Sequence, residues 1–211
     1  MKSLVKLFTL VLTLVFLVGC GGDGGGEGYS DNREVTLEMI DSSFPVLNVN
    51  AFTVESSVEY SPVSKSKINN FRDNLVSDKG FSCIPDGTQC AKSNVITGVT
   101  SNATAYLYDT SIYLDIITTG NLAHNSTLYQ EIFGSIDANI VYVYVEKSYA
   151  QNNHATHQYY VNTLREAQHG FECYLSTVSS DWVCDKIVDR VGYFWETSNG
   201  EYKAMWGIRL R

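Results

Sequence analysis

The tetrapeptide pattern Gly-Phe-x-Cys occurs twice in this sequence, as Gly80-Phe81-Ser82-Cys83 and as Gly170-Phe171-Glu172-Cys173. Each copy follows a stretch in which apolar residues recur at helical spacing, and each precedes a further cysteine, Cys90 or Cys184. Self-similarity at a fixed period indicates an internal repeat, and a repeat decides the architecture before any single element does. The sequence therefore predicts a tandem duplication of a unit of about 85–90 residues.

The expected repeat unit consists of one strand, one helix and then four strands. Helices are expected over residues 61–79 and 153–169, because Ser61-Pro62 suits a helix entry and Gly80 suits a left-handed helix end. The β-rich runs that follow each helix predict antiparallel hairpins. One helix packed on one face of an antiparallel meander is a two-layer α+β unit. We therefore expect an α+β protein with two such units and one disulfide in each.

Repeat 1 is assigned to residues 35–122 and repeat 2 to residues 123–211. The order of elements resembles cystatin-like folds, and a tandem pair with a disulfide in each copy is similar in outline to secreted β-lactamase-inhibitor proteins. The resemblance is one of topology, without a shared sequence motif. Because one fold hosts many functions, it implies an architecture and no activity.

The N-terminus has the pattern of an exported protein. A short basic start precedes an apolar run from Leu7 to Val18, which is too short for a spanning helix. The run ends in Leu17-Val18-Gly19-Cys20, which resembles the lipobox of bacterial lipoproteins. The resemblance implies that residues 1–19 are a signal peptide that is removed, and that Cys20 is then lipidated.

The same resemblance implies a stable membrane anchor, because palmitate-type acyl chains on Cys20 exceed the two signals that anchoring needs. Gly21 follows Cys20 where Asp would favour retention, so the outer membrane is favoured over the inner one. Residues 20–34 are rich in glycine and are expected to form a flexible tether. They lack the Lys-Ser/Thr ending of a nucleotide loop.

The charge of the chain excludes one class of partner. Without Lys2 and Lys6 of the signal, 13 of the 15 basic residues remain against 23 acidic ones, which gives a net charge of −10. An acidic surface disfavours binding to nucleic acid and to anionic headgroups. We therefore expect no nucleic-acid partner.

Four cysteines remain once Cys20 is assigned to lipid. An even number in an exported chain predicts two disulfides, for which three pairings are formally possible. The repeat selects Cys83 with Cys90 and Cys173 with Cys184, each bond inside its own copy. A zinc site is the alternative, but these spacings differ from the close cysteine pairs of zinc fingers.

The candidates for catalysis are few. His154 and His157 are three apart on an expected helix, whereas a zinc protease needs histidines four apart with a glutamate between them. We interpret both histidines as solvated residues on the polar side of that helix. Carboxylate pairs can run acid–base chemistry. The acidic residues on or beside the late strands are Asp109, Asp115, Glu196 and Glu201. We interpret these as polar surface, and we predict no catalytic residue, cofactor or metal.

The fourteen tyrosines are the most unusual feature of the composition. Tyr142 and Tyr144 fall on one face of an expected strand, and valines fall on the other. An outward aromatic face suits a protein or glycan partner, whereas the alternative is that the rings fill the core or pair across strands. The candidate binding surface is Tyr106, Tyr108, Tyr142, Tyr144, Tyr193 and Trp195.

Taken together, these patterns predict a membrane-anchored envelope lipoprotein that acts as a non-catalytic binding module. One alternative is an envelope hydrolase or metal-dependent enzyme that uses His154, His157 or the acidic residues. Another is a structural lipoprotein of an envelope assembly. The sequence does not identify the partner.

Overall fold

One ten-stranded antiparallel sheet forms the framework of the described chain. The computed structural model describes residues 34–47, 49–151, 153–198, 200 and 202–211. The strands are β1 (Thr53–Tyr60), β2 (Ser82–Cys83), β3 (Gln89–Ser93), β4 (Ser101–Leu107), β5 (Ile112–Thr119), β6 (Ile140–Ser148), β7 (Glu172–Leu175), β8 (Trp182–Val188), β9 (Val191–Ser198) and β10 (Lys203–Leu210). Their order in the sheet is β2-β3-β4-β5-β1-β6-β10-β9-β8-β7.

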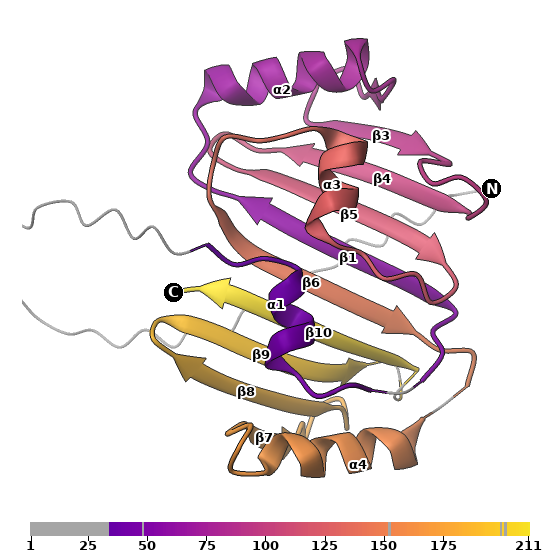
Figure 1. The fold of residues 1–211 in the computed structure, drawn as a ribbon, viewed down its shortest axis with the longest axis vertical. Coiled ribbons are helices and arrows are strands. Elements are labelled where there is room, and N and C mark those ends of the chain that lie inside the picture. The colour runs from indigo at the N-terminus through magenta and orange to yellow at the C-terminus, as the bar shows by residue number, and fades with distance from the viewer. Residues whose placement is uncertain (1–33, 48, 152, 199, 201) are drawn as a thin grey trace, which may run out of the picture. The chain divides into compact units, whose positions relative to one another are not determined.

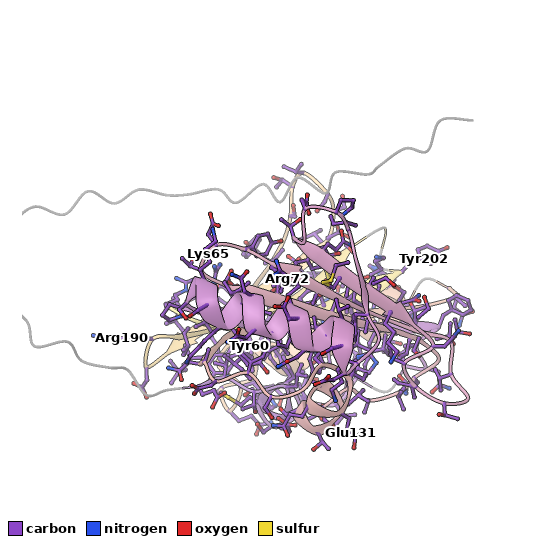
Figure 2. The ribbon with its side chains drawn as sticks, turned by 90° about the horizontal axis from the view of Figure 1, so that it is seen from above. Tyr60, Lys65, Arg72, Glu131, Arg190 and Tyr202 are labelled. Atoms are coloured by element: carbon purple, nitrogen blue, oxygen red, sulfur yellow. A yellow bond between two sulfur atoms is a disulfide. The ribbon has the colours of Figure 1, made fainter. Side chains whose placement is uncertain are left out.

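Four helices accompany this sheet in the described residues: α1 (Glu38–Ser43), α2 (Lys65–Ser77), α3 (Ser126–Phe133) and α4 (His154–Arg165). The short helices α1 and α3 lie over one face, whereas the longer α2 and α4 lie along its two ends (Figure 1). Figure 2 shows α2 from outside, with Lys65 and Arg72 on it. The protein is therefore mixed α+β, with two helices in each half where we had expected one. In the described residues, no helix combines the length and the apolar character that crossing a membrane requires.

The two halves of the chain share this sheet. Residues 35–122 supply five neighbouring strands and residues 123–211 supply the other five. The seam is the antiparallel pair of β1 and β6, in which Ser57 lies opposite Tyr144. The described residues form a single compact unit. Residues 35–122 and 123–211 therefore form one sheet within one compact unit, which the sequence had left open.

The short helices cross this seam. Phe44, at the end of α1, packs on Phe171 of the second half, with their ring centroids 5.2 Å apart. Phe133, at the end of α3, packs on Phe81 of the first half at 5.4 Å. Each half therefore places its first helix over the Gly-Phe-x-Cys motif of the other half, and the core is built from both.

The helix α2 ends where the sequence indicates, whereas α4 ends at Arg165, four residues before the expected end at His169. Gly80 has φ of +69°, which L-residues with a side chain rarely adopt, and the Phe81 N–H donates to the Leu75 carbonyl at 2.9 Å. The start differs from the prediction. Ser64, and not Ser61, caps α2, because the Ser64 hydroxyl accepts from the Lys67 N–H.

The predicted disulfides are present. Cys83 is bonded to Cys90 and Cys173 to Cys184, and the members of each pair lie directly opposite each other in the β2–β3 and β7–β8 hairpins. Cys90 and Cys184 are fully buried. Each bond therefore fastens an outer hairpin to the core beside a long helix.

Candidate functional site

The two faces of the sheet differ in character. On β4 the buried Ala103, Ala105 and Leu107 point into the core beneath the helices. Tyr106 points the other way, as the period of two in a strand requires. In Figure 1 this opposite face lies behind the sheet, where no described helix covers it. Half-buried aromatic residues gather there, and we call them the tyrosine face: Tyr106, Tyr113, Tyr142, Tyr144 and Phe194.

The rings of the tyrosine face form a continuous row. Tyr106 contacts Tyr113, and Tyr113 contacts Tyr142, with centroid distances of 6.3 and 6.4 Å. Tyr142 also contacts Tyr144 and Phe194, both at 6.3 Å. The row therefore extends across the middle of the sheet, from β4 to β9.

Two rings of the row lean over an intervening strand. Tyr113 and Tyr142 both lie opposite Glu59, so β1 separates their strands. Strands two apart are about 9–10 Å from each other. Ring centroids only 6.4 Å apart therefore mean that the two rings incline toward each other across β1. Beneath them, Ser57 is buried.

Gly207 makes room for the other end of the row. Phe194 lies opposite Gly207, and a Cβ atom at Gly207 would be 2.0 Å from Cζ of the Phe194 ring. The ring therefore lies directly on the glycine and reaches Tyr142, to which it is nearly parallel, with 11° between the planes. This is the arrangement in which an aromatic side chain covers a glycine of a neighbouring strand.

We expect Gly207→Ala to lift the Phe194 ring off the sheet and to lower the free energy of unfolding by about 1–3 kcal/mol, as overpacking does. Urea unfolding measures the loss. In a Phe194→Ala background the same substitution should cost less, because the clash is gone, and a double-mutant cycle reports the difference. Equal costs in the two backgrounds would contradict the placement of the ring.

Carboxyl groups lie between the rings. Glu55 on β1 is directly opposite Glu146 on β6, and Asp115 on β5 accepts a hydrogen bond from the Ser57 hydroxyl at 2.5 Å. Glu146 accepts from the Tyr144 hydroxyl at 2.9 Å and forms an ion pair with Lys203 at 2.5 Å. The site therefore concentrates like charges on a partly apolar surface.

Burial raises the pKa of three acids on this face, and neighbouring carboxylates add to the effect at Glu55 and Glu196. Burial, followed by the charges of Asp115 and Glu146, raises the pKa of Glu55 to about 7. Burial raises the pKa of Asp115 to about 6, against the lowering effect of the hydrogen bond from Ser57. Burial, followed by the charges of Asp181 and Glu146, raises the pKa of Glu196. The ionised form of each acid is therefore disfavoured in the folded protein.

The raised pKa of Glu55 predicts a pH-dependent stability. Between about pH 4.5 and pH 7 the folded protein keeps a proton that the unfolded chain releases, so stability falls as pH rises through this window. Glu55→Gln should remove this loss and raise the free energy of unfolding at about pH 8 by about 1–2 kcal/mol, after allowance for partial exposure. Urea titrations at several pH values test this. The exposed Glu172→Gln is the matched control and should change stability by less than about 0.5 kcal/mol.

The structure separates the six residues that the sequence grouped as a binding surface. Tyr106, Tyr142 and Tyr144 belong to the tyrosine face. Tyr108 lies in the β4–β5 turn and is 56% exposed. Tyr193 and Trp195 face the core on the opposite side, and Trp195 is fully buried.

Tyr193 and Trp195 face the core because the strand pairing of the second half places them at core positions of β9. Cys90 lies opposite Ala105, whereas Cys184 lies opposite Trp195. Trp195 therefore takes the place of a core residue, and Phe194 takes the outward place. Sequence reasoning missed Tyr113 as a residue of this face. Its outward position could have been predicted, because the apolar Ile112 and Leu114 flank it in an alternating run.

The interpretation of both α4 histidines as solvated is wrong for one of them. His154 is exposed, but His157 is fully buried, with ring centroids 5.6 Å from Tyr149 and 5.9 Å from Trp195. The first turn of α4 packs on the core, so the side facing the sheet is covered. Burial, followed by the charge of His154, lowers the pKa of His157 to about 4.

The acidic candidates are spread over the molecule. Asp109 is exposed in the β4–β5 turn, whereas Glu196 lies on β9, with β1, β6 and β10 between β5 and β9. Glu201 lies outside the described residues. Across the described ranges, no group of three or more His, Cys, Asp or Glu residues could hold a metal ion.

A buried polar network that we did not predict lies under α3. His124 bonds through Nδ1 to the Ser56 hydroxyl at 2.6 Å and through Nε2 to the Thr118 hydroxyl at 2.9 Å. The Tyr129 hydroxyl donates to the Ser56 carbonyl at 2.6 Å. Ser56 is fully buried, so no substrate reaches its hydroxyl. The network therefore holds α3 on the sheet and does not form a catalytic pair.

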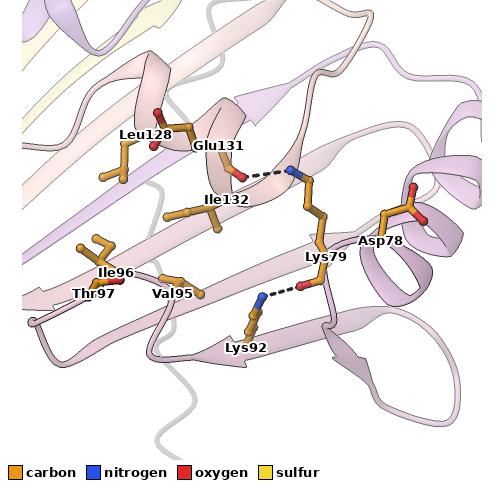
Figure 3. Close-up of a pocket in the computed structure, with 9 residues that line it drawn as sticks. All are labelled: Asp78, Lys79, Lys92, Val95, Ile96, Thr97, Leu128, Glu131 and Ile132. Atoms are coloured by element: carbon orange, nitrogen blue, oxygen red, sulfur yellow. Dashed lines mark hydrogen bonds between the residues drawn. The ribbon is translucent and has the colours of Figure 1, made fainter.

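A groove of about 340 Å³ lies between α3 and the segment after β3 (Figure 3). Its apolar part includes Val95, Ile96 and Leu128. Lys79 donates to the Glu131 carbonyl at 3.0 Å, and Lys92 donates to the Lys79 carbonyl at 2.5 Å. The Lys79 bond joins α3 of the second half to the first half, and the Lys92 bond holds Lys79 within the first half.

No protein-family model matches this chain, and comparison with curated proteins and with solved structures gives no match.

Proposed function

We propose that this protein is an exported lipoprotein that works as a non-catalytic binding module, with the tyrosine face as its binding surface. The observation that carries the proposal is the continuous row of rings from Tyr106 to Phe194, half-buried and without a described helix over it. Aromatic residues are enriched at the centres of protein interfaces, and they supply contact area at a small cost in side-chain entropy.

The proposal includes anchoring through Cys20, with the outer membrane favoured. Its support is the lipobox at Leu17–Cys20, which lies outside the described residues. We expect Cys20→Ser to move the protein from the membrane fraction to the soluble fraction after cell fractionation, because the acyl chains supply the attachment. Intact mass of the extracted wild-type chain provides the control, since three acyl chains on Cys20 should be visible directly. An unmodified Cys20 on a membrane-held chain would contradict the anchor.

We further infer that the two halves arose by tandem duplication. Helix, strand, helix and four strands follow one another in each half. Three pairs of residues with matching positions in the two halves are each separated by 89 residues. Ser64 and Asn153 precede the long helices, and Phe44 and Phe133 pack across the seam. Leu75 and Leu164 are the buried leucines of the long helices. A shared offset at three unrelated roles supports a common origin of the halves.

Photo-crosslinking in intact membranes tests the binding surface. A photoreactive amino acid at Tyr113 should give an adduct, whereas the same amino acid at Tyr159, which is 74% exposed on α4, should not. Adduct formation at Tyr113 should disappear when Phe194→Ala and Tyr142→Ser disrupt the row in a chain that still unfolds cooperatively. Equal adducts at both positions, or none at Tyr113, would overturn the proposed surface. A stoichiometric adduct with one membrane component would favour the structural-lipoprotein version of the proposal.

A further inference from the structure

We propose that the tyrosine face binds a basic polypeptide segment, with arginine or lysine side chains lying across the rings and meeting Glu55 and Asp115. This inference rests on the proposed function and adds the chemical class of the partner to it.

The charge of the face selects a cationic partner. Its strands between β4 and β9 carry two basic side chains on this side, Lys203 and Arg209, against five acidic ones. The acidic side chains are Glu55, Glu59, Asp115, Glu146 and Glu196. An acidic surface attracts cations during encounter and repels anionic partners.

The arrangement of the acids favours an organic cation over a metal ion. Glu55 faces Glu146 across the seam, and burial together with the charges of Asp115 and Glu146 disfavours the charge of Glu55. A cation placed between them relieves that repulsion. The part of the chain that the structure describes holds no metal-binding cluster. Rings surround the acids instead, and guanidinium and ammonium groups bind to ring faces as well as to carboxylates.

The face already holds a cation in this way. The Arg209 guanidinium lies 6.0 Å from the ring centroid of Tyr142. Lys203 reaches Glu146 beside Tyr144. Glu55 and Asp115 lie on the neighbouring strands β1 and β5, and a partner's side chain could add a further cation there.

The shape of the face favours a polypeptide over a small amine. The row crosses six neighbouring strands, which is about 24 Å at the usual strand spacing. An open sheet face cannot enclose a small ligand to the 70–90% that such ligands typically need. A chain that presents several cations along the row gains from multivalency.

Fluorescence anisotropy with labelled peptides tests the proposal on the full chain in detergent, at about pH 8, which is above the pKa values of Glu55 and Asp115. The probe is hexa-arginine, and hexa-citrulline, its neutral isostere, is the matched control. We expect hexa-arginine to bind at least about tenfold more tightly. The double variant Glu55→Gln/Asp115→Asn should weaken hexa-arginine binding by about tenfold or more.

A second double variant removes the same net charge away from the face. Asp73→Asn/Glu172→Gln should change hexa-arginine affinity less than about twofold. Equal losses from the two double variants, or equal binding of the two peptides, would overturn the proposal. A neutral oligosaccharide, cellohexaose, separates this failure from failure of the surface itself. Cellohexaose binding that requires Phe194 and displaces hexa-arginine would show that the basic partner is wrong. The tyrosine face would still be the binding surface.

Discussion

Phe133→Ala is expected to lower the free energy of unfolding by about 3–4 kcal/mol and to unfold both halves of the protein together. Phe133 is 2% exposed and packs on Phe81 and Tyr129. It belongs to the second half but stabilises the first. Truncation therefore removes apolar burial and leaves a cavity at the contact between the halves.

Tryptophan fluorescence makes this result decisive, because all three tryptophans lie in the second half, at positions 182, 195 and 206. If the halves fold as one unit, the urea midpoints from fluorescence and circular dichroism should both fall and should coincide. Phe52→Ala, at a ring that is 64% exposed, is the control and should stay within about 0.5 kcal/mol of wild type. An unchanged fluorescence midpoint beside a lowered dichroism midpoint would show that the halves unfold independently.

Trp195→Ala is expected to lower the free energy of unfolding by about 3–5 kcal/mol. The indole is fully buried, with ring centroids 5.0 Å from Tyr160 and 5.9 Å from His157. If Trp195 lay on a binding surface, as the sequence suggested, Trp195→Ala would remove binding and leave the free energy of unfolding unchanged. Urea unfolding and hexa-arginine binding therefore distinguish the two placements.

The control for Trp195 is Tyr174→Ala, because Tyr174 is an aromatic residue of the second half that is 55% exposed. It should change the free energy of unfolding by less than about 0.5 kcal/mol. A Trp195→Ala protein with wild-type stability and no peptide binding would mean that Trp195 faces the partner after all.

Local signals explain what the sequence predicted well. The repeated cysteines selected the disulfides, because the bonded residues are cross-strand neighbours in a hairpin. Gly80 marked the end of α2, since it adopts the positive φ that favours glycine, whereas Gly170 also has a positive φ but lies five residues beyond the end of α4. Such features depend on a few adjacent residues, so they can be recognised in the chain alone.

Non-local contacts explain what the sequence did not predict. Three consecutive aromatic residues, Tyr193, Phe194 and Trp195, fit either face, and a period of two cannot choose between them. The choice follows from Gly207 and Cys184 on the neighbouring strands. The burial of His157 likewise depends on Tyr149 and Trp195, which contact it from other elements.

The position of β10 has a consequence for how the chain reaches its folded state. This strand comes last in the sequence but lies inside the sheet, between β6 and β9, and α1, the first described helix, packs on it. Contacts of such long sequence separation slow folding, because a long loop must close before they form. Until Lys203–Leu210 arrives, β6 and β9 each present an unpaired edge. Synthesis of the first half alone therefore cannot complete the core, because the inner strands of the second half and the residues that pack on α1 are still missing.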